Sequence, residues 1–204
     1  MNQKLRKTCF LGSILLFLLL AFLVTLKLTT HVDEAVSKLF IELRNPGLTM
    51  FFKQITDFGY VQVLVILIAV ILIVFHKYRF AYILPIHVGI CVIFNLLLKN
   101  LFLRPRPTFP HLVEETGFSF PSGHAMVTMT AYGYLIYVVY HYIKILWLKY
   151  LLITVLSCLI ILVGISRIYL GVHYLTDVLA GFSISIFYLM VVTKLKIFSL
   201  ESKK

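Results

Sequence analysis

Long uninterrupted runs of apolar residues restrict the fold of this chain more than any other feature. Each run has roughly the twenty residues that a helix needs to cross the hydrocarbon core of a bilayer. Of the 204 residues, 61% are hydrophobic and only 13% are charged, which is far less charge than a soluble domain carries. The sequence therefore predicts an all-α, polytopic membrane protein that forms one integral membrane domain over residues 1–204.

Six membrane-spanning helices can be drawn from these runs. The first run follows Lys4, Arg6 and Lys7, as the core of a cleaved signal peptide would. It is longer than a usual signal core and has no clear small-residue cleavage site, so an uncleaved span is favoured. The predicted spans cover residues 9–29, 60–75, 80–102, 122–140, 150–168 and 174–193.

Two shorter segments separate the first two spans. Residues 33–44 place apolar groups at 36, 39, 40 and 43 and charges elsewhere, which is the spacing of an amphipathic helix lying flat at the membrane interface. Residues 46–58 begin with Pro46 and Gly47 and mix phenylalanines with charged side chains. We interpret them as a half-polar lead-in to the second span.

The distribution of Lys and Arg predicts the orientation in the membrane. With the N-terminus in the cytoplasm, nearly all of the net charge of +11 falls on the inner side, whereas acidic residues balance the outer side. Cytoplasmic loops are enriched in Lys and Arg, so both termini are predicted inside. The basic residues lie in short loops rather than on a soluble face, which favours contact with anionic lipids over nucleic-acid binding.

The three cysteines, Cys9, Cys91 and Cys158, each lie inside an apolar run. They show no CxxC or Cys/His spacing that would suggest a metal site. We interpret them as small buried hydrophobic residues.

Three short polar clusters interrupt the apolar sequence. The six-span arrangement brings all three to the outer face, although they are far apart in the chain. Ionisable side chains are costly in a membrane protein and usually mark a functional site. The clusters are residues 99–107 (KNLFLRPRP), 121–124 (PSGH) and 166–177 (SRIYLGVHYLTD).

The second cluster has the features of a phosphate site at a helix N-terminus. Ser122 is a favoured N-cap, and the free backbone N–H groups of a first helical turn bind phosphate readily. Gly123 permits close approach of the phosphate, and His124 projects from the same turn. Taken alone, the motif is equally consistent with a plain N-cap beside an uninvolved histidine.

Lys99 and Arg106 would complete such a site. Arg offers a planar fork to two phosphate oxygens, and Lys adds a point charge. Considered alone, Lys99 is more simply a snorkelling lysine at a helix end and Arg106 a loop cation. Arg104 competes with Arg106 for the phosphate-binding role.

His173 and Asp177 are four residues apart and would share one helix face. A carboxylate that accepts from one imidazole nitrogen selects the tautomer and leaves the other nitrogen free to attack phosphorus. The alternative is an interfacial histidine beside a helix-capping aspartate. Arg167 just upstream favours the catalytic interpretation.

Together, Lys99-x6-Arg106-Pro107, Pro121-Ser122-Gly123-His124 and Ser166-Arg167-x5-His173-x3-Asp177 resemble the three-part signature of the type-2 phosphatidic acid phosphatase family, over residues 99–181. The resemblance implies a metal-independent lipid phosphatase without a cofactor. It implies that His173 is the nucleophile that forms a phosphohistidine, that Asp177 orients it, and that His124 protonates the leaving group. The implied phosphate-binding residues are Lys99, Arg106, Ser122, Gly123 and Arg167.

The implied substrate is a membrane lipid within the bilayer of a bacterial plasma membrane, with the active site at the outer face. Bacterial members of the family include undecaprenyl diphosphate and phosphatidylglycerophosphate phosphatases, so a broad enzyme for both is expected, with phosphatidic acid as a further substrate. Two alternatives are an anion or lipid transporter and a catalytically silent lipid-binding relative. A transporter would carry polar residues at mid-membrane depth, and a silent relative usually lacks a histidine. The oligomeric state is not predicted.

Overall fold

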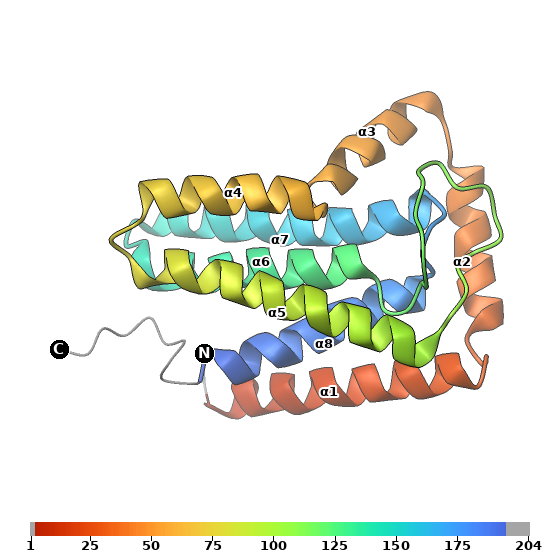
Figure 1. The fold of residues 1–204 in the computed structure, drawn as a ribbon, viewed down its shortest axis with the longest axis horizontal. Coiled ribbons are helices and arrows are strands. Elements are labelled where there is room, and N and C mark those ends of the chain that lie inside the picture. Colours follow the sequence, from red (N-terminus) through yellow and green to blue (C-terminus); the bar gives the residue numbers. More distant parts are fainter. Residues whose placement is uncertain (1–2, 195–204) are drawn as a thin grey trace.

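The computed structural model describes residues 3–194, and in that range the chain forms eight α-helices and no strand (Figure 1). The predicted all-α fold is therefore confirmed for this part of the chain. The helices are α1 (Gln3–Thr25), α2 (Thr30–Glu42), α3 (Pro46–Asp57), α4 (Val61–Val74), α5 (Arg79–Phe102), α6 (Gly123–Tyr142), α7 (Leu146–Tyr169) and α8 (Leu175–Val192).

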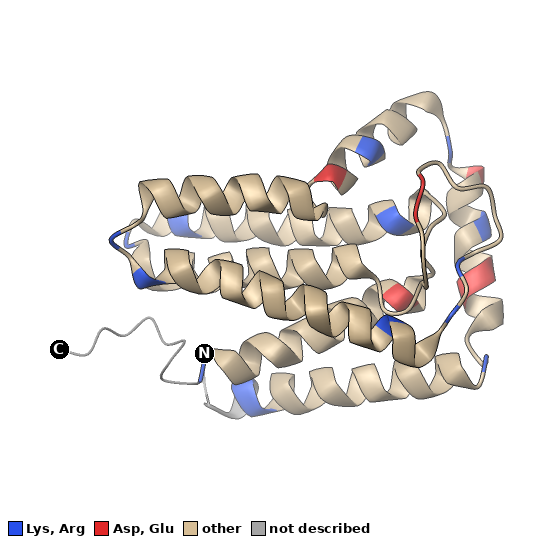
Figure 2. Ribbon diagram, in the orientation of Figure 1, with Lys and Arg blue, Asp and Glu red and all other residues tan. Residues whose placement is uncertain are grey.

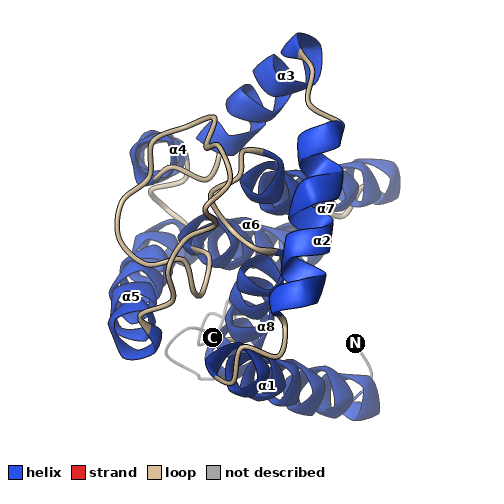
Figure 3. Ribbon diagram, turned by 90° about the vertical axis from the view of Figure 1, so that its right-hand side faces the viewer, coloured by secondary structure: helices blue, strands red, loops and turns tan. Residues whose placement is uncertain are grey.

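Helix α6 lies at the centre of a bundle that α2 crosses at one end (Figures 1 and 3). It packs against α5, α7 and α8, while α1 packs against α8 on the outside. Ala125, Met126 and Tyr134 of α6 are at most 2% exposed. The hydrophobic core is therefore built around α6, and most of the exposed large apolar side chains lie on the surrounding helices.

Helices occur at all six predicted span positions, but the predicted count of six spans is not established. Four stretches are long and apolar enough to cross a membrane, and α3 with α4 would make a fifth span bent by 52°. Helix α6 is not among them, because its sequence carries glycines, threonines and several tyrosines. The four stretches are Arg6–Thr25, Arg79–Phe102, Leu146–Tyr169 and Leu175–Val192.

The segment predicted as an interfacial helix forms α2, which begins before residue 33 and ends at Glu42. Its fully buried side chains are polar, Asp33 and Ser37, whereas Leu39 is 54% exposed. The side of α2 that faces the protein therefore combines these buried polar residues with Val36 and Phe40, which are half-buried and pack against apolar residues of the bundle. Its position relative to a membrane interface stays a prediction.

Residues 46–58 form the separate helix α3 rather than a simple lead-in. Asn45 caps it by accepting a hydrogen bond from the Leu48 N–H at 2.9 Å, and Pro46 occupies the first helical turn, where its missing N–H has no cost. Helix α3 packs against α7. It thereby brings Thr56, which is buried, close to the end of α7.

The interpretation of the cysteines was wrong for two of the three. Cys91 is buried, but Cys9 is half-buried and Cys158 is exposed. An apolar run in a membrane helix indicates an apolar surrounding, which lipid supplies as well as protein does. The run therefore could not show which cysteine faces the core.

Among the described residues, the acidic side chains lie toward one end of the bundle, whereas Lys and Arg occur at both ends (Figure 2). Figure 2 shows the acidic residues at the end that α2 crosses and at the junction of α3 and α4, while the opposite end carries Lys and Arg. This placement of the acidic residues agrees with the uneven charge distribution read from the sequence. The basic residues at 196, 203 and 204, which also entered that prediction, lie outside the described residues.

Candidate active site

The ends of four helices bring the predicted site residues together at the end of the bundle near α2. Because α5, α6, α7 and α8 run alternately up and down, the C-termini of α5 and α7 meet the N-termini of α6 and α8 (Figure 1). Lys99 and Arg167 lie in the last turns of α5 and α7. The loop between α5 and α6 folds over this end and contributes Arg104 and Arg106.

The N-terminus of α6 has the predicted N-cap. The Ser122 side chain accepts from the Ala125 N–H at 3.5 Å, and the Ser122 N–H donates to the backbone carbonyl of Asp177 at 3.0 Å. A Cβ at Gly123 would lie 3.0 Å from Oδ1 of Asn95. Gly123 therefore also allows α6 to pack closely against α5, a requirement that the sequence pattern did not reveal.

His173 is 2% exposed and contacts Arg106, with 3.4 Å between its Nε2 and the Arg106 Nη1. An arginine N–H can only donate, so Nε2 is the acceptor and the proton of the neutral ring is on Nδ1. Nδ1 lies 3.5 Å from Oδ2 of Asp177. This places the carboxylate on one side of the ring and the free lone pair on the other.

The charge state of His173 follows from its surroundings. Burial lowers its pKa well below the ordinary value, and the positive charges of Arg167, Arg106 and Lys99 lower it further. The ring is therefore neutral at neutral pH, as a nitrogen nucleophile must be.

Asp177 is held by Arg104 rather than by a phosphate-binding residue. Arg104 donates from Nη1 to the Asp177 carboxylate and from Nη2 to Asp33 at 2.7 Å. Both carboxylates are fully buried. The Tyr174 N–H donates to the other Asp177 oxygen at 2.9 Å, and the Tyr174 ring lies 4.3 Å from the Arg104 guanidinium. Arg104, the competing candidate for phosphate, already has its partners.

Arg106 holds loop carbonyls and faces the site. It donates to the carbonyls of Thr116 at 2.8 Å, Gly117 at 3.0 Å and Val172 at 2.9 Å. Lys99 donates from Nζ to the Phe118 carbonyl at 2.7 Å. Each of these acceptors is a neutral backbone group.

Arg167 is fully buried beneath the loop. Its Nη1 donates to Oγ1 of Thr56 at 2.7 Å, and its Nη2 donates to the carboxylate of Glu115. The second carboxylate oxygen of Glu115 lies 3.5 Å from Nη2 of Arg106. Glu115 thus connects two of the cations that the family resemblance assigns to phosphate binding.

A cavity of about 260 Å³ opens beside these residues. His124 borders it from the first turn of α6, where the Tyr60 ring packs edge-on at a centroid distance of 4.6 Å. Nε2 of His124 is buried without a hydrogen-bond partner among the described residues. The lining residues are Gly59, Tyr60, Val61, Gln62, Val92, Asn95, Leu96, Lys99, Glu115, Gly123, His124, Val127 and His173.

The structure therefore brings all eight predicted residues to one end of the bundle. Lys99, Gly123, His124 and His173 line the cavity. Among residues 3–194, no three His, Cys, Asp or Glu side chains are grouped so that they could hold a metal ion. The arrangement offers one neutral imidazole, a second imidazole with an unused nitrogen, and three cations.

Four contributors to the site were missed by the sequence interpretation. Thr56 and Tyr60 come from segments without a motif, and no sequence signal marks them. Asp33 and Glu115 were counted only as outer charges. The one available signal for Asp33 is its position on the side of the helix that would be buried. An unpaired buried carboxylate is costly, so such a position indicates that Asp33 has a cationic partner.

Comparisons with known proteins agree with this geometry. The family model described as PAP2 superfamily matches residues 80–199. Phosphatidylglycerophosphatase B of Bacillus subtilis (strain 168) is 35% identical over 84% of this chain and 87% of its own. An undecaprenyl-diphosphatase of Sulfolobus acidocaldarius is 30% identical over 66% of this chain and 53% of its own.

A solved structure has the same fold. It is the crystal structure of a transmembrane PAP2 type phosphatidylglycerolphosphate phosphatase from Bacillus subtilis, with a TM-score of 0.83 and 35% identity, covering 90% of this chain and 94% of that chain. That protein is transmembrane, and the apolar helices of this chain agree with an integral, multi-pass membrane protein. Because the family model matches residues 80–199 and a relative is 35% identical over most of both chains, this chain belongs to the PAP2 superfamily.

Proposed function

We propose that this protein is a metal-independent membrane lipid phosphatase that works through a phosphohistidine intermediate. The observation that carries the proposal is the contact between Nε2 of His173 and Arg106, beside a cavity that Lys99 and His124 also line. A neutral, oriented imidazole next to a cluster of cations is what nucleophilic attack on a phosphate requires. The names of the similar bacterial and archaeal proteins support a lipid phosphate as substrate.

In the first step, the phosphate is held by Lys99, Arg106, Arg167, the hydroxyl of Ser122 and the backbone N–H of Gly123. Nε2 of His173 forms a bond to phosphorus while the bond from phosphorus to the lipid oxygen breaks. The departing oxygen takes a proton from His124. Asp177 stabilises the positive charge that appears on the phosphorylated ring through the proton on Nδ1.

In the second step, the now neutral His124 takes a proton from water. The water oxygen bonds to phosphorus as the nitrogen–phosphorus bond breaks, which releases inorganic phosphate and restores neutral His173. The unused Nε2 of His124 is available for both proton transfers.

We further propose that the substrates are undecaprenyl diphosphate and phosphatidylglycerophosphate, with phosphatidic acid as a third. The site lies at one end of the bundle, where a head group can enter while the lipid tail remains in the bilayer. The protein would lie in a bacterial plasma membrane, with both termini in the cytoplasm and the site at the outer face. Helix α6 has 20 residues and a length of about 30 Å, so it is long enough to cross the membrane and would bring the number of spans to six.

The direct test is a phosphate-release assay on the purified protein in detergent with EDTA. It compares the three lipids and uses His173→Ala as the matched control. We expect release by the native protein and none by the variant. Full activity of His173→Ala would remove the nucleophile assignment, and loss of native activity in EDTA would remove the metal-independent mechanism.

A further inference from the structure

Glu115 is the acidic side chain that faces the predicted phosphate-binding arginines. One of its carboxylate oxygens accepts from Arg167, and the other lies 3.5 Å from Nη2 of Arg106. The side chains are 0% exposed for Arg167, 9% for Arg106 and 18% for Glu115, so the contacts are largely shielded from water. The two guanidinium groups thus share the two oxygens of the Glu115 carboxylate. They would bind two oxygens of a phosphate in the same way.

We propose that Glu115 is an internal competitor for the phosphate site, which an incoming phosphate must displace from Arg106 and Arg167. This inference rests on the proposed function of the same site and identifies a residue that determines substrate selectivity. Glu115 would act as a charge filter, admitting ligands that carry more negative charge than the carboxylate they replace.

The surrounding contacts allow the Glu115 side chain to leave without unfolding the loop. The backbone on its C-terminal side is held by Arg106, through the carbonyls of Thr116 and Gly117, and by Lys99, through the carbonyl of Phe118. These bonds do not involve the carboxylate. The carboxylate can therefore leave the two arginines while these loop contacts stay in place.

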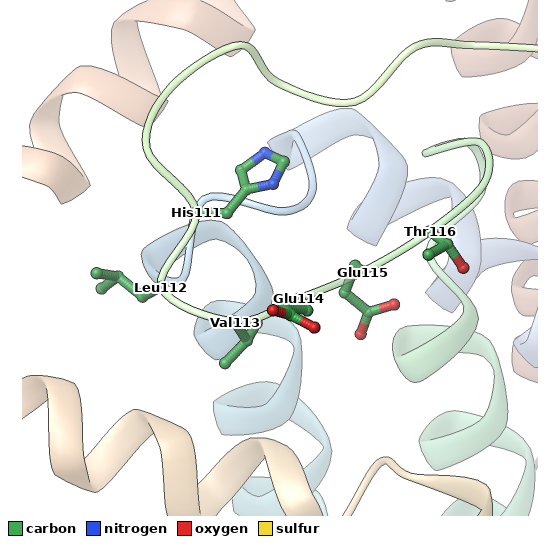
Figure 4. A pocket seen from close by; sticks show the side chains of 6 residues that line it. All are labelled: His111, Leu112, Val113, Glu114, Glu115 and Thr116. Carbon is green, nitrogen blue, oxygen red and sulfur yellow. The ribbon is translucent and has the colours of Figure 1, made fainter.

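A place for the displaced carboxylate also exists. Glu115 lines the site cavity and also a second, more open pocket of about 490 Å³ formed by residues 111–116 (Figure 4). Figure 4 shows Glu115 between Glu114 and Thr116 on the loop segment that forms this pocket. Because Glu115 borders both spaces, its carboxylate can move from the arginines toward solvent.

The charges decide which ligands succeed. A phosphate monoester carries about −1.5 to −2 at neutral pH, whereas a carboxylate carries one negative charge. Exchange of the carboxylate for a terminal phosphate therefore gains attraction to the site cations. A phosphodiester carries a single negative charge, so exchange for the head group of an ordinary diester phospholipid gains none.

The test compares the native protein with Glu115→Gln and with the matched control Glu114→Gln, whose side chain is exposed on the same loop. Binding of inorganic phosphate at pH 8 is measured by calorimetry on the purified protein in detergent. Because Glu115→Gln removes the negative charge that competes for the two arginines, we expect this variant to bind phosphate at least about tenfold more tightly. Glu114→Gln should bind as the native protein does.

A second measurement uses micelles that contain phosphatidylglycerol, a diester lipid. Phosphatidylglycerol should compete with inorganic phosphate for the site in Glu115→Gln, but not in the native protein. Glu115→Ala provides a second neutral variant, and a melting curve shows that each variant is folded. Unchanged or weaker phosphate binding in both folded variants would overturn the charge filter.

The outcome is separable from that of the proposed function. If the native protein releases phosphate from lipids while neither variant changes phosphate affinity, the charge filter is wrong and the phosphatase function stands. If phosphate binding tightens as expected but no lipid is hydrolysed, the anion site and its competitor stand and the phosphatase function is wrong.

Discussion

Two polar regions flank His173 and balance their charges in opposite ways. Around Arg104, one cation is shared by the two fully buried carboxylates of Asp33 and Asp177. On the other side, Lys99, Arg106 and Arg167 surround the single carboxylate of Glu115. We call the first region the Arg104 clamp and the second the anion site.

The two loop arginines show the difference most directly. Burial lowers the pKa of Arg104, but the carboxylates of Asp177 and Asp33 raise it more, so that it lies above its ordinary value. The pKa of Arg106 is lowered by burial and by Arg167, against the attraction of Glu115. Arg104 has two carboxylate partners and therefore stabilises the fold. The three cations of the anion site share one carboxylate, so they retain positive charge that can bind an anion.

The strongest test of the comparison is the residue between the two regions. His173→Ala should lower kcat/KM for lipid phosphate by at least ~10⁴-fold, because the nucleophile cannot be replaced by its neighbours. Acid-free quenching and detection of phosphohistidine should show the modified residue only in the native protein. A phosphohistidine that persists in the variant would place the nucleophile elsewhere.

Removing the cation of the Arg104 clamp should mainly affect stability. Arg104→Met leaves two buried carboxylates without their partner, which typically costs about 3–5 kcal/mol. We expect a large drop in the thermal unfolding midpoint in detergent. Lys53→Met, at an exposed position of α3, is the control that should melt as the native protein does.

Removing a cation of the anion site should mainly affect catalysis. Arg106→Met should lower kcat/KM by about 10²–10³-fold, because a donor to the developing charge is lost. Its unfolding midpoint should fall less than that of Arg104→Met, since its backbone acceptors can turn to water. Equal destabilisation by the two substitutions would show that the two regions do not differ in the way described.

The pH dependence should reflect the cations around His173. Its lowered pKa keeps the ring neutral, and activity is lost when falling pH protonates it. The acid-side inflection of kcat/KM should therefore lie below pH 6.5, with about a tenfold loss per pH unit beneath it. Arg106→Met should move this inflection upward by removing a positive charge. A shift in the opposite direction would contradict the electrostatic account.

The helical positions were predictable because they depend on local sequence. The apolar runs gave α4 and α5 almost to the residue, and the Pro-Ser-Gly pattern marked the start of α6. The largest error was at α1, which begins at Gln3 rather than at residue 9. The prediction that His173 and Asp177 share one helix face was wrong, because His173 lies in the turn before α8 and only Asp177 is in the helix. The turn still brings the two side chains near each other, at a nitrogen–oxygen distance of 3.5 Å, which is longer than expected for a hydrogen bond.

The partners of the arginines were not predictable. Arg104 and Arg106 are two residues apart in one loop, and their side-chain chemistry is identical. Only the fold, which places α2 against the start of α8, gives Arg104 its carboxylates. Arg106 was chosen from the family pattern, and the structure supplies the physical difference between the two.

The sequence by itself determined that the chain forms apolar helices and that its polar clusters gather at one end, because both follow from hydrophobicity and helix direction. Tertiary structure alone decided which charges meet. The contacts of Asp33 with Arg104, Thr56 with Arg167, and Glu115 with two arginines join segments far apart in the chain. Such contacts depend on how helices pack and a loop folds over them, and no local spacing encodes that arrangement.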